Sequence, residues 1–142
     1  MNMNYFIKSA LILIVSTTPF VCNGQKKVID AKLNVRSVTV FEENFEDNKQ
    51  GTKTKEAFTK FDAQNNILEE IEYDKDEKIK SHITYEYDAS GNKIRETYLK
   101  ANGTTDKVFA YTYLNGLKTE KIVYYSNGKV KSKKSYVYQF AN

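Results

Sequence analysis

One pattern recurs along the chain between positions 61 and 140. Its copies open at Phe61-Asp62, Tyr87-Asp88 and Tyr113-Leu114, and Tyr138-Gln139 begins a fourth, at intervals of 26, 26 and 25 residues. Self-similarity at a fixed period of this size indicates one supersecondary unit stacked on its neighbours. Most of the fold must therefore be built from one small unit that repeats.

Each unit predicts two strands. Residues 79–87, 105–113 and 130–138 alternate between two residue sets, and period-two alternation is typical of strands. An aromatic pair ends each of these segments: Tyr85/Tyr87, Tyr111/Tyr113 and Tyr136/Tyr138. The first strands of the units are expected at 67–73, 93–99 and 117–125, and residues 33–45 and 52–61 are expected to form a degenerate hairpin of the same kind. Eleven Tyr, eight Phe and a single Pro suit a sheet protein.

Short turn sequences separate the expected strands. Asn102-Gly103, Asn115-Gly116 and Asn127-Gly128 predict type I′ turns, which need positive φ at both central residues. Gly91-Asn92 and Asn65-Asn66 are expected to fill the same role, and Gly51 to take positive φ in the first hairpin. These links leave no room for a crossover helix. The sequence therefore predicts an all-β fold, an antiparallel meander of about eight strands.

The same alternation predicts the two faces of the sheet. The tyrosine pairs should form a row on one face, with Lys, Glu, Thr and Arg dominating a wet opposite face. An aromatic face on the order of 1,000 Å² is too large for a monomer to leave open. The sheet is expected to twist strongly or curl into a half-barrel; two packed layers and burial against a partner are the alternatives.

The first 24 residues differ from the rest and predict a secretory signal peptide, followed by one domain over residues 25–142 with repeats at 61–86, 87–112 and 113–137. Lys8 is followed by an apolar stretch that is shorter than a membrane span. Cys22, the only cysteine, lies in this segment. It would carry the lipid if the protein were a lipoprotein anchored to the outer membrane, although Pro19-Phe20-Val21 fits that processing poorly. Export to the periplasm or the exterior is the favoured localisation.

The motifs resemble a known repeat family. Tyr87-Asp88-Ala89-Ser90-Gly91-Asn92 is similar to the YD repeat of RHS-type proteins, and Tyr124-Tyr125-Ser126-Asn127-Gly128-Lys129 resembles a variant MORN repeat. The whole chain resembles small exported proteins of Bacteroidetes-type bacteria that carry such hairpins. Large YD-repeat proteins wind many copies into a shell or contact carbohydrate. Three copies cannot enclose anything, so the resemblance implies the fold and export rather than an activity.

Candidate chemistry is sparse, and each instance has a simpler structural interpretation. His82 is the only histidine and is expected on the charged surface. Three further groups carry candidate chemistry: the carboxylates Glu69, Glu70 and Glu72, the turn acids Asp74, Asp76 and Glu77, and the lysines Lys129, Lys131, Lys133 and Lys134. The three carboxylates are expected to lie on a solvated strand rather than to form the catalytic pair of a glycosidase. The turn acids predict a solvated turn rather than a calcium-binding loop. The lysines are interpreted as protection of a sheet edge rather than a nucleic-acid site.

The sequence favours a non-enzymatic binding or structural module of the cell envelope, without catalytic residues, metal or cofactor. Its partner would be a polysaccharide or a protein, and not nucleic acid, bound through the tyrosine face or a sheet edge. The candidate contact row is Tyr85, Tyr111 and Tyr136. A homo-oligomer through the face or an edge is a further option, and membrane attachment would require lipidation at Cys22. The alternative function is a toxin- or secretion-associated accessory of the immunity or scaffold type.

Overall fold

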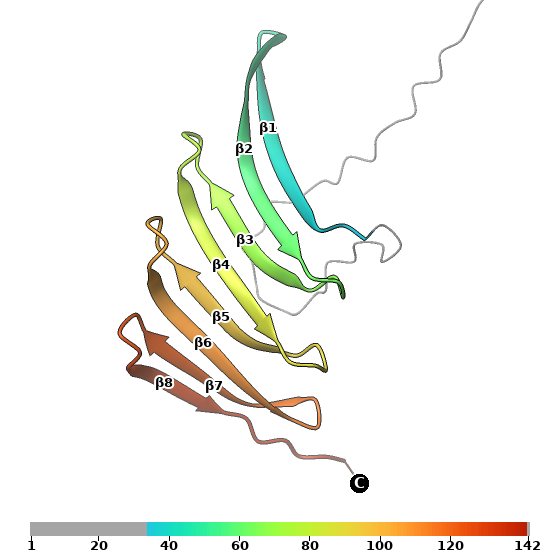
Figure 1. Cartoon of the computed structure of the whole chain (residues 1–142), viewed down its shortest axis with the longest axis vertical. Coiled ribbons are helices and arrows are strands. Elements are labelled where there is room, and N and C mark those ends of the chain that lie inside the picture. Colours follow the sequence, from blue (N-terminus) through green and yellow to red (C-terminus); the bar gives the residue numbers. More distant parts are fainter. Residues whose placement is uncertain (1–33, 142) are drawn as a thin grey trace, which may run out of the picture.

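A computed structural model describes residues 34–141, which form one eight-stranded antiparallel sheet in the order β1-β2-β3-β4-β5-β6-β7-β8 (Figure 1). The strands are β1 (Ser37–Glu46), β2 (Lys49–Phe61), β3 (Ile67–Tyr73), β4 (Ile79–Tyr87), β5 (Lys93–Leu99), β6 (Thr105–Leu114), β7 (Leu117–Tyr125) and β8 (Val130–Ser135). Every strand pairs with its neighbour in sequence, and the described residues contain no helix. The predicted all-β meander is confirmed. The signal peptide and Cys22 lie outside the described residues.

The sheet is a single open layer. Strand contacts join only sequence neighbours, so within residues 34–141 no second layer covers either face and β1 does not meet β8. Figure 1 shows the strands curving along their length and stacked from β1 at one end to β8 at the other. Only Phe61, Val108 and Glu96 among the described residues are buried, and none is fully buried. Both faces therefore stay in contact with solvent.

Asp88 explains the Tyr-Asp pairs at the turns. Its Oδ1 accepts hydrogen bonds from the backbone N–H groups of Ser90 and Asn92, at 2.9 and 2.8 Å. Its backbone closes the loop, because Gly91 N–H donates to the Asp88 carbonyl and Asp88 N–H donates to the Asn92 carbonyl. Asp62 and Asp74 repeat these contacts in their own turns. A short side chain that accepts backbone N–H groups two residues on favours such turns.

Two of the three expected type I′ turns are wrong. Asn115 and Gly116 both have positive φ, at 52° and 77°, so that turn is confirmed. In the turns at Asn102-Gly103 and Asn127-Gly128 only the glycine has positive φ. There the Asn side chain accepts the N–H of the residue two positions on. These turns follow the Asp88 pattern, a type I turn followed by one left-handed residue, which is the other common hairpin solution.

The expectation for Gly51 is also wrong. The first hairpin turns at Asp47 and Asn48, whose φ values of 47° and 60° are positive, whereas Gly51 lies within β2. A Cβ on Gly51 would stand 2.6 Å from the Asn44 carbonyl oxygen. This glycine therefore serves a close backbone approach rather than the turn.

Register shifts recur at the turn end of the hairpins. They lie between Lys60 and Phe61, Glu72 and Tyr73, Glu86 and Tyr87, Tyr98 and Leu99, Thr112 and Tyr113, and Val123 and Tyr124. An extra residue on one strand bends it and increases the local twist. The repeated bulge therefore gives each unit the same bend and is consistent with the curvature of the sheet.

Candidate functional site

Cross-strand partners define the two faces, because residues directly opposite one another point to the same side. Tyr85 pairs with Glu96 and Glu96 with Phe109. Tyr111, two positions beyond Phe109, pairs with Lys121, which pairs with Lys134. Tyr136 lies two residues beyond Lys134, so the three predicted tyrosines share one side. We call this side the tyrosine face.

The predicted row is partly covered rather than fully open. Tyr85 and Tyr111 are half-buried, and Tyr136 is 38% exposed. Each of these side chains is therefore partly packed within the sheet and partly in contact with solvent, which suits side chains with an apolar body and a polar tip.

Tyr85 is held by a carboxylate on the neighbouring strand. Its hydroxyl donates a hydrogen bond of 2.6 Å to Glu70 Oε2. Burial, this hydrogen bond and the charges of Glu70 and Glu96 raise the pKa of Tyr85 far above its ordinary value. Burial likewise raises the pKa of Tyr87 to about 12, with Glu70 and Asp62 adding to the effect. Tyr85 therefore acts as a neutral hydrogen-bond donor throughout the physiological range.

Glu96 shows that acids also lie on the tyrosine face, contrary to the expected separation of aromatic and charged sides. It is 5% exposed and forms an ion pair with Lys93. The Tyr98 hydroxyl lies 3.4 Å from Glu96 Oε2. Lys93 Nζ also stands 5.0 Å from the Tyr85 ring centroid. The acid can be buried because a cation and a hydroxyl compensate it.

Lysines and aromatic rings alternate over β5, β6 and β7. Lys107 Nζ lies 4.2 Å from the Tyr98 ring centroid, and Lys121 Nζ lies 4.2 Å from that of Phe109. Lys118 Nζ lies 4.5 Å from the Tyr111 centroid. We call this set the basic aromatic surface: Tyr98, Lys107, Phe109, Tyr111, Tyr113, Lys118 and Lys121. Ammonium groups at these distances are attracted to ring faces and keep N–H donors for a ligand.

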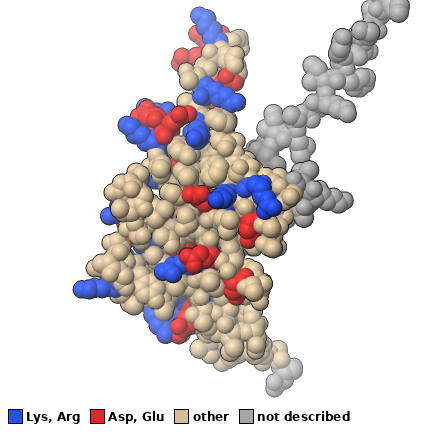
Figure 2. Space-filling view, in the orientation of Figure 1, with Lys and Arg blue, Asp and Glu red and all other residues tan. Residues whose placement is uncertain are grey.

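The opposite face carries the expected polar residues, such as Glu69, Thr84 and Arg95, but it is not purely polar. Register places a band of apolar residues on it: Phe58, Ile71, Leu99, Val108, Ala110 and Ile122. His82 sits between Ile71 and Leu99, and its Nε2 lies 2.7 Å from Glu69 Oε1. His82 is therefore a half-buried partner of a carboxylate rather than a free surface residue. The charged side chains are dispersed, and Figure 2 shows both signs side by side on the face in view.

The remaining acids are engaged as sheet and turn residues. Glu69 pairs with Lys60 and Thr84, whereas Glu70 and Glu72 share the tyrosine face. In the next turn, Asp74 accepts backbone N–H groups, and Glu77 Oε1 accepts the Lys55 N–H at 2.7 Å. Within residues 34–141, no group of His, Cys, Asp and Glu side chains is arranged to hold a metal ion.

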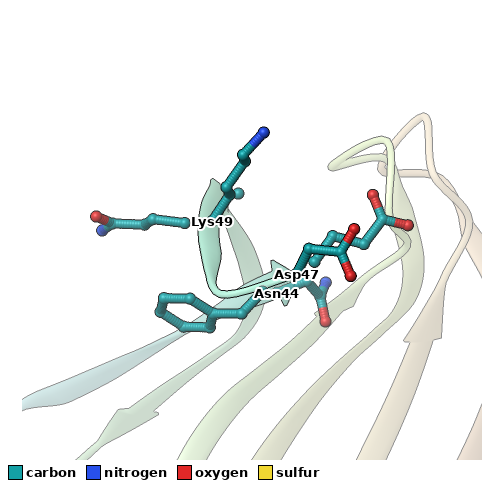
Figure 3. A pocket seen from close by; sticks show the side chains of 7 residues that line it. Asn44, Asp47 and Lys49 are labelled. Carbon is teal, nitrogen blue, oxygen red and sulfur yellow. The ribbon is translucent and has the colours of Figure 1, made fainter.

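Two surface hollows are present among the described residues, and neither brings a set of catalytic side chains together. One, of about 700 Å³, lies at the tip of the β1–β2 hairpin, where Lys49 and Asp47 extend in different directions (Figure 3). The other, of about 510 Å³, lies between β5, β6 and β7 and is lined by Arg95, Val108 and Tyr124 among others. Neither gathers a nucleophile, a base and an oxyanion donor.

Sequence reasoning missed the hydroxyl contacts that link one repeat to the next. Tyr113 donates to the Lys93 carbonyl at 3.1 Å, and Tyr138 donates to the Lys118 carbonyl at 2.8 Å. Donor and acceptor are 20 residues apart in both cases. Each contact ties a tyrosine that opens one repeat to the first strand of the repeat before it. The recurrence of Tyr113 and Tyr138 at the repeat interval was the available signal.

Comparison with known proteins adds no relative, because the sequence matches no family model and no curated protein. In the part of the chain that the structure describes, no helix is long and apolar enough to cross a membrane. The site must therefore be interpreted from its own geometry.

Proposed function

We propose that the protein is a non-enzymatic binding module of the cell envelope that holds an anionic polysaccharide on the basic aromatic surface. The observation that carries this is the alternation of lysines and rings on one open face, with Lys107, Lys118 and Lys121 each within 4.5 Å of a ring centroid. Sugar rings stack on aromatic faces, while ammonium groups pair with carboxylate or sulfate substituents. The export expected from residues 1–24 would place the module where such polymers occur.

Charge on this surface favours an anionic ligand over a neutral one. Lys93 neutralises the buried Glu96, and beyond β5 the paired residues of the tyrosine face include Lys107, Lys118, Lys121 and Lys134 and no acid. Cations clustered on one face attract a polyanion at long range, and salt screens that attraction. Binding should therefore weaken as ionic strength rises.

The test is calorimetric titration with a polyuronate such as alginate, with neutral dextran in parallel. The double variant Lys118→Gln/Lys121→Gln should lose about tenfold in affinity, because each charge–charge contact contributes about 0.7 kcal/mol and two such contacts make about 1.4 kcal/mol. The matched control Lys60→Gln/Lys133→Gln removes two charges from the opposite face and should bind like the unmodified protein.

The aromatic contribution is tested separately. Tyr111→Leu should weaken alginate binding several-fold, whereas Tyr111→Phe should keep it, because stacking depends on the ring. Equal affinity for alginate and for a single-stranded oligonucleotide would show that charge alone governs binding and would overturn the polysaccharide proposal. Absence of alginate binding at low salt would overturn it as well.

A further inference from the structure

The sheet that residues 34–141 form ends in two edges of opposite charge. β1 carries Glu42, Glu43 and Glu46 and no Lys or Arg, whereas β8 carries Lys131, Lys133 and Lys134 and no acid. A strand at the edge of a sheet presents unpaired N–H and C=O groups to which another strand can add. Two β1 edges repel each other, as do two β8 edges, but β1 attracts β8. The charges therefore select one pairing out of three.

Neighbouring strands leave one charge on each edge poorly compensated. Glu43 and Glu46 face Lys53 and Lys49 on β2, but Glu42 faces Thr54. On β8, Lys133 forms an ion pair with Glu120 at 2.5 Å, but Lys134 faces Lys121, a like charge. Like charges directly opposite are destabilising. Glu42 and Lys134 are thus the two edge charges that gain most from meeting.

The outward-pointing backbone N–H and C=O groups of β1 and β8 alternate in a way that lets the two strands pair. Tyr136 N–H donates to the Thr119 carbonyl, so by alternation the N–H groups of Lys133 and Ser135 point away from β7. The Arg36 carbonyl accepts a hydrogen bond from Phe61 N–H. By the same alternation, the backbone N–H and C=O groups of Ser37 and Thr39 point away from β2. On both edges these outward residues carry their side chains on the face opposite the tyrosines. A β1–β8 pair would therefore continue both faces without a break.

Strand direction agrees as well. Eight strands alternate in direction from β1 to β8, so the β1 of a second copy placed beside β8 would be antiparallel to it. Lys133 and Ser135 must then face odd-numbered residues of β1, and Lys134 an even-numbered one. The register with Lys134 opposite Glu42 meets this condition.

This register also brings exposed apolar residues together. Counting along both strands, Tyr136 comes opposite Val40 and Tyr138 opposite Val38. These four side chains are all partly exposed, at 38%, 38%, 42% and 39% in that order. Val38 and Val40 pair with Thr59 and Ala57, on the side of the sheet that carries the tyrosines. Covering these side chains would add apolar burial to the charge pairing.

We propose that copies of this chain associate head to tail, β1 of one copy adding antiparallel to β8 of another with Glu42 opposite Lys134. This assembly is independent of the polysaccharide proposal. Because its two contact surfaces differ, it generates rings when the rotation closes and open filaments when it does not. Each added copy extends the tyrosine face by eight strands.

Charge reversal on purified full-length protein tests the pairing, with mass measured by analytical ultracentrifugation. The unmodified chain should form species larger than its 16.4 kDa monomer. Glu42→Lys/Glu43→Lys and Lys133→Glu/Lys134→Glu should each be monomeric, because each gives both of its own edges the same sign. An equimolar mixture of the two variants should associate again. Lys100→Glu, in the β5–β6 turn, is the control and should behave like the unmodified chain.

Disulfide trapping tests the register in a Cys22→Ser background. Opposite residues in antiparallel strands have Cα atoms about 4.5–5.5 Å apart, within disulfide range. Glu42→Cys/Lys134→Cys should yield covalent multimers on mild oxidation, and Thr39→Cys/Lys134→Cys should not. A monomeric unmodified chain, failure of the mixture to associate, or equal trapping of both cysteine pairs would overturn the proposal.

Discussion

The Tyr85 hydroxyl and Glu70 Oε2 are 2.6 Å apart on the adjacent strands β4 and β3. Glu70 lies directly opposite Ile83, and Tyr85 is two residues beyond Ile83 on the same strand, so the contact between Tyr85 and Glu70 is diagonal. The diagonal distance between strands suits a long side chain such as Tyr. This pair shows how the tyrosine face is stabilised: by hydroxyls and lysines bonded to carboxylates, together with ring packing.

Replacing the hydroxyl should measure that contact. Tyr85→Phe is expected to lower the free energy of unfolding by about 1–2 kcal/mol, because a hydrogen bond to a charged group is lost. Urea titration followed by circular dichroism is the measurement. Tyr125→Phe, whose side chain is exposed, is the control and should change stability by less than about 0.5 kcal/mol. Equal effects of the two substitutions would contradict the assigned role of Glu70.

The Lys93–Glu96 pair should respond differently to single and double substitution. Lys93→Gln leaves the buried Glu96 carboxylate without its cation and should cost about 3 kcal/mol. The double variant Lys93→Met/Glu96→Leu removes both charges and should recover most of the loss, because no uncompensated charge remains. Denaturant midpoints of the single and double variants make the comparison. A double variant less stable than Lys93→Gln would contradict this account.

The left-handed turn position should discriminate among residue types. Gly91 has a φ of +79° with open space around its α-carbon, so Gly91→Ala should cost about 1–2 kcal/mol through conformation alone. Gly91→Asn should cost less, because Asn65 occupies the equivalent position at a φ of 61°. Thermal unfolding of the two variants, with Ser90→Ala as control, ranks them. If Gly91→Ala and Gly91→Asn had the same thermal unfolding midpoint, backbone strain would not be the cause of the lost stability.

Alkaline pH should destabilise the sheet. Burial raises the pKa of Tyr87 to about 12 and raises that of Tyr85 further, whereas unfolded tyrosine titrates near pH 10. Above about pH 10 the unfolded chain loses protons that the folded chain retains, so stability should fall as pH rises toward 12. Tyrosinate absorbance, recorded together with circular dichroism, should show exposed tyrosines titrating first. One common titration midpoint for all tyrosines in the folded state would refute the prediction.

Acid pH should loosen the turns. The Asn92 side-chain and backbone hydrogen bonds, with that from Ser90, lower the pKa of Asp88 below its ordinary 3.8. The contribution of this turn is therefore fully present above the unfolded pKa and is lost as pH falls through the folded value. Asp88→Asn should flatten the dependence of the urea midpoint on pH between about 5 and 2. Unchanged pH dependence in this variant would remove Asp88 as a contributor.

The strand pattern could be predicted because each signal was local. Alternation over residues 79–87 matches β4 (Ile79–Tyr87), and the segments 67–73, 93–99 and 117–125 match β3, β5 and β7. The turn types were harder to predict from the sequence. Asn102-Gly103 and Asn127-Gly128 satisfy the local requirement for a type I′ turn, but here the loop includes a bulge and needs only one left-handed residue.

The candidate site was predictable in its aromatic part only. The repeat placed Tyr85, Tyr111 and Tyr136 on one side, as the pairing of the strands confirms. Their partners depend on register, and a shift beside each turn changes which residues meet. No local pattern showed that Glu96 would be buried beside Lys93, or that Ile71 and Leu99 would flank His82.

The sequence by itself determined the unit: two strands, a turn closed by a short polar side chain, and tyrosines at a fixed interval. These features depend on backbone conformation and on the two-residue strand period, which residues close in sequence specify. Only the tertiary structure decided which charges neutralise each other and that the apolar groups divide between two open faces. It also placed an acidic strand at one edge and a basic strand at the other. Those outcomes depend on cross-strand register and on the number of strands, which the whole chain sets together.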